Sequence, residues 1–181
     1  MFTENGFRIE VGLFSFGALN KIKHMNNTEI LLFAFSVNLG IALGAGLYEI
    51  RIVLPLWFHL QKNKNYRVDF EAMRKIDTGR KFWSFITTIP LTLLTIANLY
   101  FAFHTKAPLY SWWMTATFII LIERIGTFAF FIPTAIKLQK GEELSVSKTK
   151  RLVLWWIRLN YVRNALTFAA LLISLKALMI V

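Results

Sequence analysis

The stretch ILLFAFSVNLGIALGAGLY, Ile30–Tyr48, holds 19 consecutive residues without a charged side chain. A bilayer core about 30 Å thick is crossed by about 20 helical residues, so this stretch is long enough to span a membrane. Further apolar runs follow at Phe82–Phe103, Leu109–Ile136 and Ile157–Leu175. A helix at the surface of a soluble bundle would present a charged face to water, whereas these runs carry few charges. The sequence therefore predicts four transmembrane helices.

The composition agrees with a membrane protein and narrows the chemistry. Of the 181 residues, 56% are hydrophobic, and 17 are phenylalanine, whereas soluble domains contain about 45–50% apolar residues. The chain has no cysteine, which excludes disulfides, thiolate metal sites and a cysteine nucleophile. Its three histidines leave little material for a haem or zinc site. We therefore expect a protein without a cofactor or a bound metal.

The formal net charge of +11 is explained by orientation in the membrane. The predicted loops Arg51–Lys81 and Lys137–Arg151 together hold thirteen Lys and Arg residues, against five on the opposite side. Cytoplasmic loops carry such an excess. We therefore predict a multi-pass protein of the cell membrane, the inner membrane in a bacterium, with both long loops cytoplasmic and both termini outside. The basic loops then face anionic lipid headgroups, and we expect no nucleic-acid partner.

The connections between the runs are short, which makes sequential helices antiparallel neighbours. We predict an all-α fold, a four-transmembrane-helix antiparallel bundle, formed by a single domain over residues 28–181. Residues 1–27 lack the apolar core of a signal peptide. We expect them to be an N-terminal extension that is poorly ordered or not native, with Met25 as an alternative start.

A short interfacial helix between the first two spans is predicted over Val68–Lys81. The pairs Glu71/Lys75 and Asp77/Lys81 have the i,i+4 spacing that supports a helix. Capping residues and prolines predict where the other helices begin and end. They are Asn26 with Glu29 at the start of helix 1, Pro55 at its end or kink, Asp77 or Thr78 before helix 2, Gly141 after helix 3, and Ser145 or Ser147 before helix 4.

Two further patterns predict how the spans pack. Ser36, Gly40 and Gly44 form a ridge of small residues, which favours a close contact between helices. Pro90 is expected to bend the second span. The six tryptophans fall near predicted span ends, which is typical of an aromatic belt at the membrane surfaces. They are Trp57, Trp83, Trp112, Trp113, Trp155 and Trp156.

Each span carries one polar stripe at the 3.6-residue period of a helix. Polar groups in lipid are costly and face partner helices or wet cavities, so the four stripes should converge on the bundle interior. The stripe residues are Asn38 and Glu49 in helix 1; Ser84, Thr88, Thr95 and Asn98 in helix 2; Glu123, Thr127 and Thr134 in helix 3; and Trp156, Asn160, Arg163, Asn164, Thr167 and Ser174 in helix 4.

The charges within or beside the spans are unequal in sign. The acids are Glu49 and Glu123, and the arginines are Arg51, Arg124, Arg158 and Arg163. Estimated depth, at 1.5 Å per residue, predicts a central pair of Glu123 with Arg163 and a lower pair of Glu49 with Arg158. The two remaining arginines need an anion, water or lipid phosphate if they are buried. The surplus predicts a pocket for an anionic or oxygen-rich aromatic ligand; the alternative is an ion-pair network that fixes helix register.

Several short strings also resemble a known family. They are GLYEIR at Gly46–Arg51, PLW at Pro55–Trp57, DTGR at Asp77–Arg80 followed by Phe82–Trp83, Glu123–Arg124, FIP at Phe131–Pro133, and RLNYVR at Arg158–Arg163. Over about Leu31–Leu175 the chain resembles small bacterial and fungal four-helix membrane proteins, mostly of unknown function. The characterised members of that family are similar to the anthrone oxygenases of polyketide pathways.

The resemblance implies a reaction that needs no cofactor. A base would remove the acidic proton beside a carbonyl, and the resulting enolate would react with O₂ while cationic donors hold its oxygen. The resemblance implies Glu49 or Glu123 as the base and Arg124, Arg163, Asn160 and Tyr161 as ligands to the substrate oxygens. Phe128, Phe131 and Trp156 would stack on the ring. The polar stripes and the charge surplus add Arg158, Asn38 and Asn98 as expected substrate-binding residues.

Two functions therefore remain open at the level of the sequence. The first is a cofactor-independent oxygenase, or a related enzyme that modifies phenolic or quinone substrates within the membrane. The second is a membrane protein without enzymatic activity that binds a lipid, a quinone or a partner helix. In both, the expected partners are the bilayer and an aromatic or lipid-like small molecule.

Overall fold

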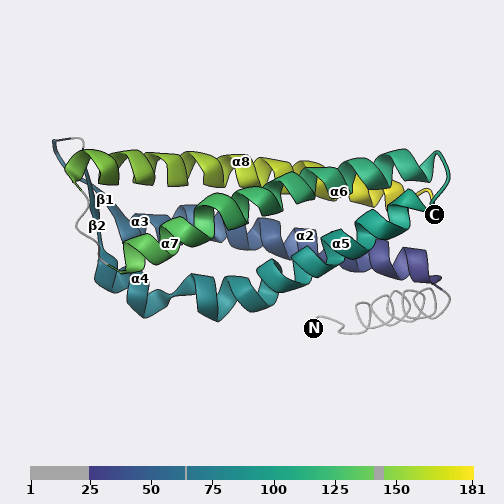
Figure 1. The fold of residues 1–181 in the computed structure, drawn as a ribbon, viewed down its shortest axis with the longest axis horizontal. Coiled ribbons are helices and arrows are strands. Elements are labelled where there is room, and N and C mark those ends of the chain that lie inside the picture. The colour runs from purple at the N-terminus through teal and green to yellow at the C-terminus, as the bar shows by residue number, and fades with distance from the viewer. Residues whose placement is uncertain (1–24, 64, 141–144) are drawn as a thin grey trace, which may run out of the picture.

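The computed structural model describes residues 25–63, 65–140 and 145–181 (Figure 1). Four of its helices are long and apolar enough to cross a membrane: Asn27–Trp57, Lys81–Phe103, Leu109–Gln139 and Val146–Leu178. The four predicted spans are confirmed, and each helix extends beyond its predicted apolar run. The last begins eleven residues before its apolar run, directly after the predicted cap Ser145. Most of the predicted N-terminal extension, and Gly141, lie outside the described residues.

The long helices lie side by side around a buried interior (Figure 1). Helix α2 (Asn27–Tyr48) packs against α5 (Ile89–Phe103) and α8 (Val146–Leu178), and α6 (Leu109–Gly126) packs against the same two helices. The outward faces carry many exposed large apolar side chains, among them Leu93, Ile122 and Phe168. A continuous apolar exterior of this kind suits lipid rather than water.

The predicted polar stripes turn inward, as expected. Their buried members are Glu49, Thr95, Asn98, Glu123, Thr127, Thr134, Trp156, Asn160, Asn164, Thr167 and Ser174. Several hydroxyls are satisfied within their own helix, since Thr95 and Thr167 donate to the carbonyl oxygens four residues earlier, at 2.6 and 2.9 Å. Such bonds allow polar residues to be buried without a partner on another helix. The remaining polar groups are available to link helices or to form a site.

Three π-helical segments interrupt the long helices, and each is followed by an α-helix whose second residue is proline. They are η1 (Glu49–Val53) before Pro55 of α3 (Leu54–Trp57), η2 (Gly79–Thr88) before Pro90 of α5, and η3 (Thr127–Phe131) before Pro133 of α7 (Ile132–Gln139). Proline cannot donate a backbone hydrogen bond, and its ring clashes with the carbonyl four residues earlier. A wider turn relieves that clash. The helices therefore continue past their prolines, and the first ends at Trp57, two residues beyond Pro55.

The segment between the first two spans differs from its prediction. Strand β1 (Phe58–Leu60) pairs with antiparallel β2 (Tyr66–Val68), and the short helix is α4 (Phe70–Ile76). The prediction of a helix over Val68–Lys81 is thus wrong at both ends, and the hairpin is unpredicted because three-residue strands are too short to show a period. Asp69 caps α4 by accepting from the Ala72 N–H at 2.8 Å. Asp77, at φ 40°, ends the helix in the left-handed conformation that Asp tolerates.

Two of the predicted caps are confirmed. Asn26 accepts from the Glu29 N–H at 2.9 Å while Glu29 accepts from the Asn26 N–H at 2.7 Å, which is a complete capping box. Ser145 accepts from the Lys148 N–H at the start of α8. Before the second span, Asp77 ends α4, and Thr78 makes no side-chain capping bond.

The close approach of two helices occurs at a different glycine from those predicted. A Cβ at Gly40 or Gly44 would meet no atom within 4 Å, so the predicted ridge is wrong at these glycines. A Cβ at Gly46 would lie 2.8 Å from Cγ of Asn164 on α8, and still closer to its Oδ1. Of the predicted ridge, only Ser36 makes a bond across to α8, at 3.0 Å from Ser174. Gly46 therefore sets the spacing of α2 and α8.

We predict that Gly46→Ala lowers the free energy of unfolding by about 1–3 kcal/mol, because the new methyl group displaces the buried Asn164 side chain. Gly44→Ala is the matched control. It adds the same methyl group to the same helix in open space, so the gain in helix propensity makes it neutral or slightly stabilising. Unfolding in detergent, followed by circular dichroism, measures both. Equal stabilities for the two variants would contradict the assignment of this contact.

Candidate functional site

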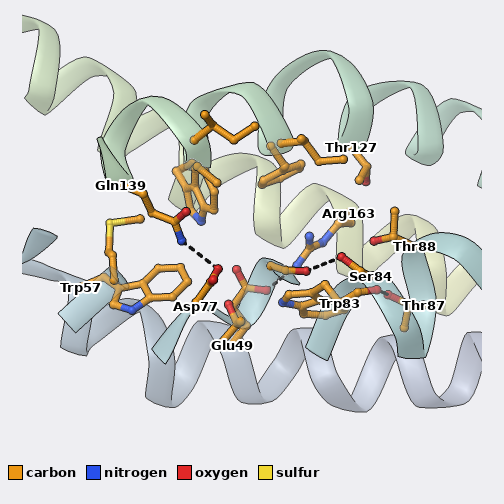
Figure 2. Close-up of a pocket in the computed structure, with 18 of the residues that line it drawn as sticks. Glu49, Trp57, Asp77, Trp83, Ser84, Thr87, Thr88, Thr127, Gln139 and Arg163 are labelled. Carbon is orange, nitrogen blue, oxygen red and sulfur yellow. Dashed lines mark hydrogen bonds and ion pairs between the residues drawn. The ribbon is translucent and has the colours of Figure 1, made fainter. Parts of the chain in front are cut away.

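A cavity of about 560 Å³ lies near the end of the bundle that carries the hairpin and α4 (Figure 2). One side is formed by η2 and the other by η3 and α7, while η1 contributes Glu49, α6 contributes Arg124, and α8 contributes Trp156 and Arg163. Met73 of α4 and Trp57 of α3, both buried, line its outer end. All three π segments thus border the cavity. Small-molecule sites commonly have about 300–1,000 Å³, so this cavity is large enough for a molecule of several rings.

An ion pair between Glu49 and Arg163 forms part of the wall. Arg163 Nη2 lies 3.0 Å from Glu49 Oε2 and donates to Asn160 Oδ1 at 2.7 Å. The guanidinium carbon lies 4.8 Å from the Trp83 ring centre and 4.7 Å from that of Phe131. Figure 2 shows Glu49, Trp83 and Arg163 pointing toward one another. Hydrogen bonds and two aromatic faces together compensate this cation for its loss of water.

A second pair joins two neighbours in the sequence, Glu123 and Arg124. Arg124 Nε and Nη2 both lie 2.5 Å from Glu123 Oε2, and Thr127 donates to Oε1 at 3.0 Å. Both oxygens of Glu123 are therefore engaged, and Glu123 does not line the cavity. Arg124 does line it, is 7% exposed, and its Nη1 finds no acceptor among the described residues.

The predicted pairs are both wrong, and so is the predicted surplus of buried arginine. Glu49 pairs with Arg163 and Glu123 with Arg124, and the other two arginines of the spans, Arg51 and Arg158, are exposed. Exposed arginines reach water or headgroups along their flexible stems. Neither of these two pairs leaves an arginine that needs an anion to neutralise it. A cavity nevertheless lies directly beside Arg163 and Arg124.

Unsatisfied hydrogen-bond donors distinguish this cavity from a packing defect. Besides Arg124 Nη1, the indole N–H groups of Trp57 and Trp156 are buried and find no acceptor within the described part of the chain, and both rings line the cavity. Buried polar groups are bonded in more than about nine cases in ten, and each one left unbonded costs about 1–3 kcal/mol. Three unsatisfied donors therefore belong to residues that line one cavity.

The predicted site residues divide into two groups. Glu49, Arg124 and Arg163 line the cavity, and Asn160 and Glu123 lie behind them as hydrogen-bond partners. The other predicted binding residues lie elsewhere. Arg158 and Tyr161 are exposed on α8, Asn38 donates to the Ile86 carbonyl at 3.1 Å, and Asn98 accepts from Trp113 at 2.7 Å.

The aromatic predictions divide in the same way. Phe131 and Trp156 line the cavity, whereas Phe128 is 49% exposed on the outer face. Trp57, Trp113 and Trp156, three of the six tryptophans predicted near the span ends, are buried among the helices. Helical periodicity is the sequence signal that separates Trp156 from the exposed tryptophans, since Trp156 continues the stripe of Asn160 and Arg163. Within the described ranges, no group of three His, Cys, Asp or Glu residues is placed to hold a metal ion.

Comparison with known proteins adds nothing to this geometry: no family model, curated protein or solved structure matches the chain. The site itself therefore carries the functional argument. It combines a buried carboxylate that has one oxygen engaged by Arg163, a buried guanidinium with one open N–H, and aromatic walls.

We predict that Arg163→Ala destabilises the protein by about 3–5 kcal/mol, because it leaves the Glu49 carboxylate buried without its partner. Arg158→Ala is the matched control, being the same change on the same helix at an exposed position, and should alter stability by less than about 0.5 kcal/mol. Thermal unfolding of both variants in one detergent makes the comparison. A larger loss for Arg158→Ala would instead support the pairing of Arg158 with Glu49.

Proposed function

We propose that the four helices form an antiparallel bundle in the cell membrane, with both long loops cytoplasmic, both termini outside and α4 at the interface. Support comes from the four apolar helices and from the excess of Lys and Arg in those loops. In this placement the cavity lies inside the bilayer near its cytoplasmic surface. Its substrate then comes from among molecules that dissolve in lipid.

We further propose that the protein is an enzyme that removes a proton from an anthrone-like or phenolic substrate and lets the resulting anion react with O₂. The observation that carries this proposal is the presence of Glu49 and the open Arg124 N–H in one cavity. A base accepts the proton, and a cationic donor stabilises the negative charge that develops on the substrate oxygen. The aromatic walls suit a flat ring. The resemblance to anthrone oxygenases implies the same chemistry.

Glu49 is a better candidate for the base than Glu123. Oε1 of Glu49 accepts no hydrogen bond from the described residues, and the side chain lines the cavity. Both oxygens of Glu123 are already bonded. We assign Glu123 to positioning Arg124, so that the open Nη1 faces the substrate oxygen. Arg163 holds the Glu49 carboxylate in place.

The proposed reaction balances without a metal or a flavin. Glu49 takes one proton from the CH₂ carbon beside the aromatic rings, and the enolate carbon forms a bond to O₂, giving a hydroperoxide once a proton is returned. Loss of water from this hydroperoxide leaves a carbonyl. The carbon is oxidised by four electrons, and O₂ is reduced by four, one oxygen atom entering the product and the other leaving as water.

We predict that Glu49→Gln lowers the rate of O₂ uptake with 1,8-dihydroxyanthrone by roughly 100-fold or more, because the amide cannot take the proton. The amide oxygen can still accept from Arg163, so the protein should remain folded. Protein reconstituted in lipid nanodiscs, corrected for oxidation in empty nanodiscs, gives the rate, and an optical spectrum reports any haem or flavin. Wild-type protein that takes up no O₂ above the empty nanodiscs would refute this activity.

A second candidate function is a membrane protein that binds a lipid, a quinone or a partner helix without turnover. The pairing of Glu49 and Glu123 with one arginine each favours it, because such pairs also fix the register of helices. The two candidates differ in the response to Glu49→Gln. In a purely structural network this change lowers the unfolding temperature, and no O₂ uptake is found for either form.

A further inference from the structure

We infer that the cavity takes a lipid with an oxygenated aromatic head and an apolar chain, which enters sideways from the bilayer between η2 and α7. This inference rests on the proposed function in treating the cavity as the substrate site and in placing these helices in the membrane. Beyond the proposed function, it specifies that the substrate carries an apolar chain and by which route the substrate enters.

The position of the opening follows from how the helices pack. Helix α5 lies against α6, whereas η2, which leads into α5, lies against α2. The faces that η2 and α7 turn toward each other line the cavity, through Ser84 and Thr88 on one side and Ile132 and Ile136 on the other. Figure 1 shows the second and third spans diverging toward the end that carries α4. The cavity therefore separates two helices that are neighbours at the opposite end.

The end of the bundle above this opening is bridged by side chains. Gln139 of α7 donates to Asp77 Oδ1 at 3.2 Å, and Arg74 of α4 donates to the Gln139 carbonyl at 3.4 Å. Helix α4 also packs against α7. In the proposed placement this end faces water, and the exposed Arg74 and Lys140 line the cavity there. The side between η2 and α7 is the route that avoids these charges.

The rim of this opening is apolar and lies within the spans. Ile136 lines the cavity and is 49% exposed, and Phe85 and Ile89 on the opposite helix are exposed as well. Both rim segments belong to helices long and apolar enough to cross a membrane. In the proposed placement, an apolar chain attached to a bound ring passes out among the lipid tails. The ring oxygens meanwhile meet the open N–H groups of Arg124, Trp57 and Trp156.

Two quinones that differ only in the chain test this route, namely 2,3-dimethyl-1,4-naphthoquinone and 2-decyl-3-methyl-1,4-naphthoquinone. Binding to the protein in phosphatidylcholine nanodiscs is followed by quenching of tryptophan fluorescence and expressed per mole fraction of ligand in the lipid. With a lateral opening the decyl chain stays in lipid, so both quinones bind within about threefold of each other. If the only opening faced water, the chain would have to leave the bilayer, and binding would weaken roughly 1,000-fold or more.

A reversible block at the rim gives a second and independent readout. The chain has no cysteine, so Ile136→Cys creates one thiol at the rim, which benzyl methanethiosulfonate modifies. Phe128→Cys is the matched control, since Phe128 has the same 49% exposure on the same long helix but lies outside the cavity. Modification at position 136 should weaken binding of the decyl quinone by roughly tenfold and leave binding of the dimethyl quinone unchanged. Reduction, followed by removal of the reductant, should restore binding.

Three outcomes overturn the inference. Unmodified protein binds the dimethyl quinone but not the decyl quinone, modification at positions 136 and 128 has an equal effect on binding, or neither quinone binds. Failure of the proposed function is seen separately. Binding of the decyl quinone with a blockable rim but no O₂ uptake refutes the enzyme and supports the route. If the protein takes up O₂ with 1,8-dihydroxyanthrone but does not bind the decyl quinone, the enzyme is supported and the lateral route is refuted.

Discussion

The guanidinium group of Arg163 is the point on which the four spans converge. It is bonded to Glu49 at the start of η1, lies over Trp83 of η2 and Phe131 at the end of η3, and projects from α8. One side chain therefore contacts every long helix at one level of the bundle. A buried cation needs such an enclosure, because a single carboxylate does not replace its lost hydration. The enclosure in turn fixes the depth of each helix relative to the others.

The three prolines explain why this convergence leaves a cavity. Each proline follows a π segment, and a widened turn changes the direction in which the following side chains point. Three widened turns at one level prevent the close packing found at the other end, where small residues such as Ala102 and Ala177 are fully buried. Aromatic rings and the two arginines border the space that results. The prolines thus shape the cavity, although none of them contacts the Arg163 guanidinium.

The sequence predicts the spans and their inward faces well, because both follow from hydropathy and helical period. It does not predict the ion pairs, for two physical reasons. Depth counted at 1.5 Å per residue set Arg158 level with Glu49, whereas Arg163, five residues farther along α8, forms the pair. The side chains of adjacent helical residues point about 100° apart, which spoke against a pair of Glu123 with Arg124. The long arginine side chain nevertheless folds back far enough to bond to Glu123.

The balance of charge also decides what kind of ligand suits the cavity. Glu49 and Glu123 already pair with Arg163 and Arg124, and the buried Asp77 also lines the cavity, so a permanently anionic ligand would add a further negative charge in a region of low dielectric. A neutral carbonyl or phenol instead satisfies the open N–H groups at no cost in net charge. Once the proton moves to Glu49, that carboxyl becomes neutral, and the negative charge passes to the substrate oxygen beside Arg124. The total charge is unchanged, so the enclosed site can stabilise the anion only when the reaction creates it.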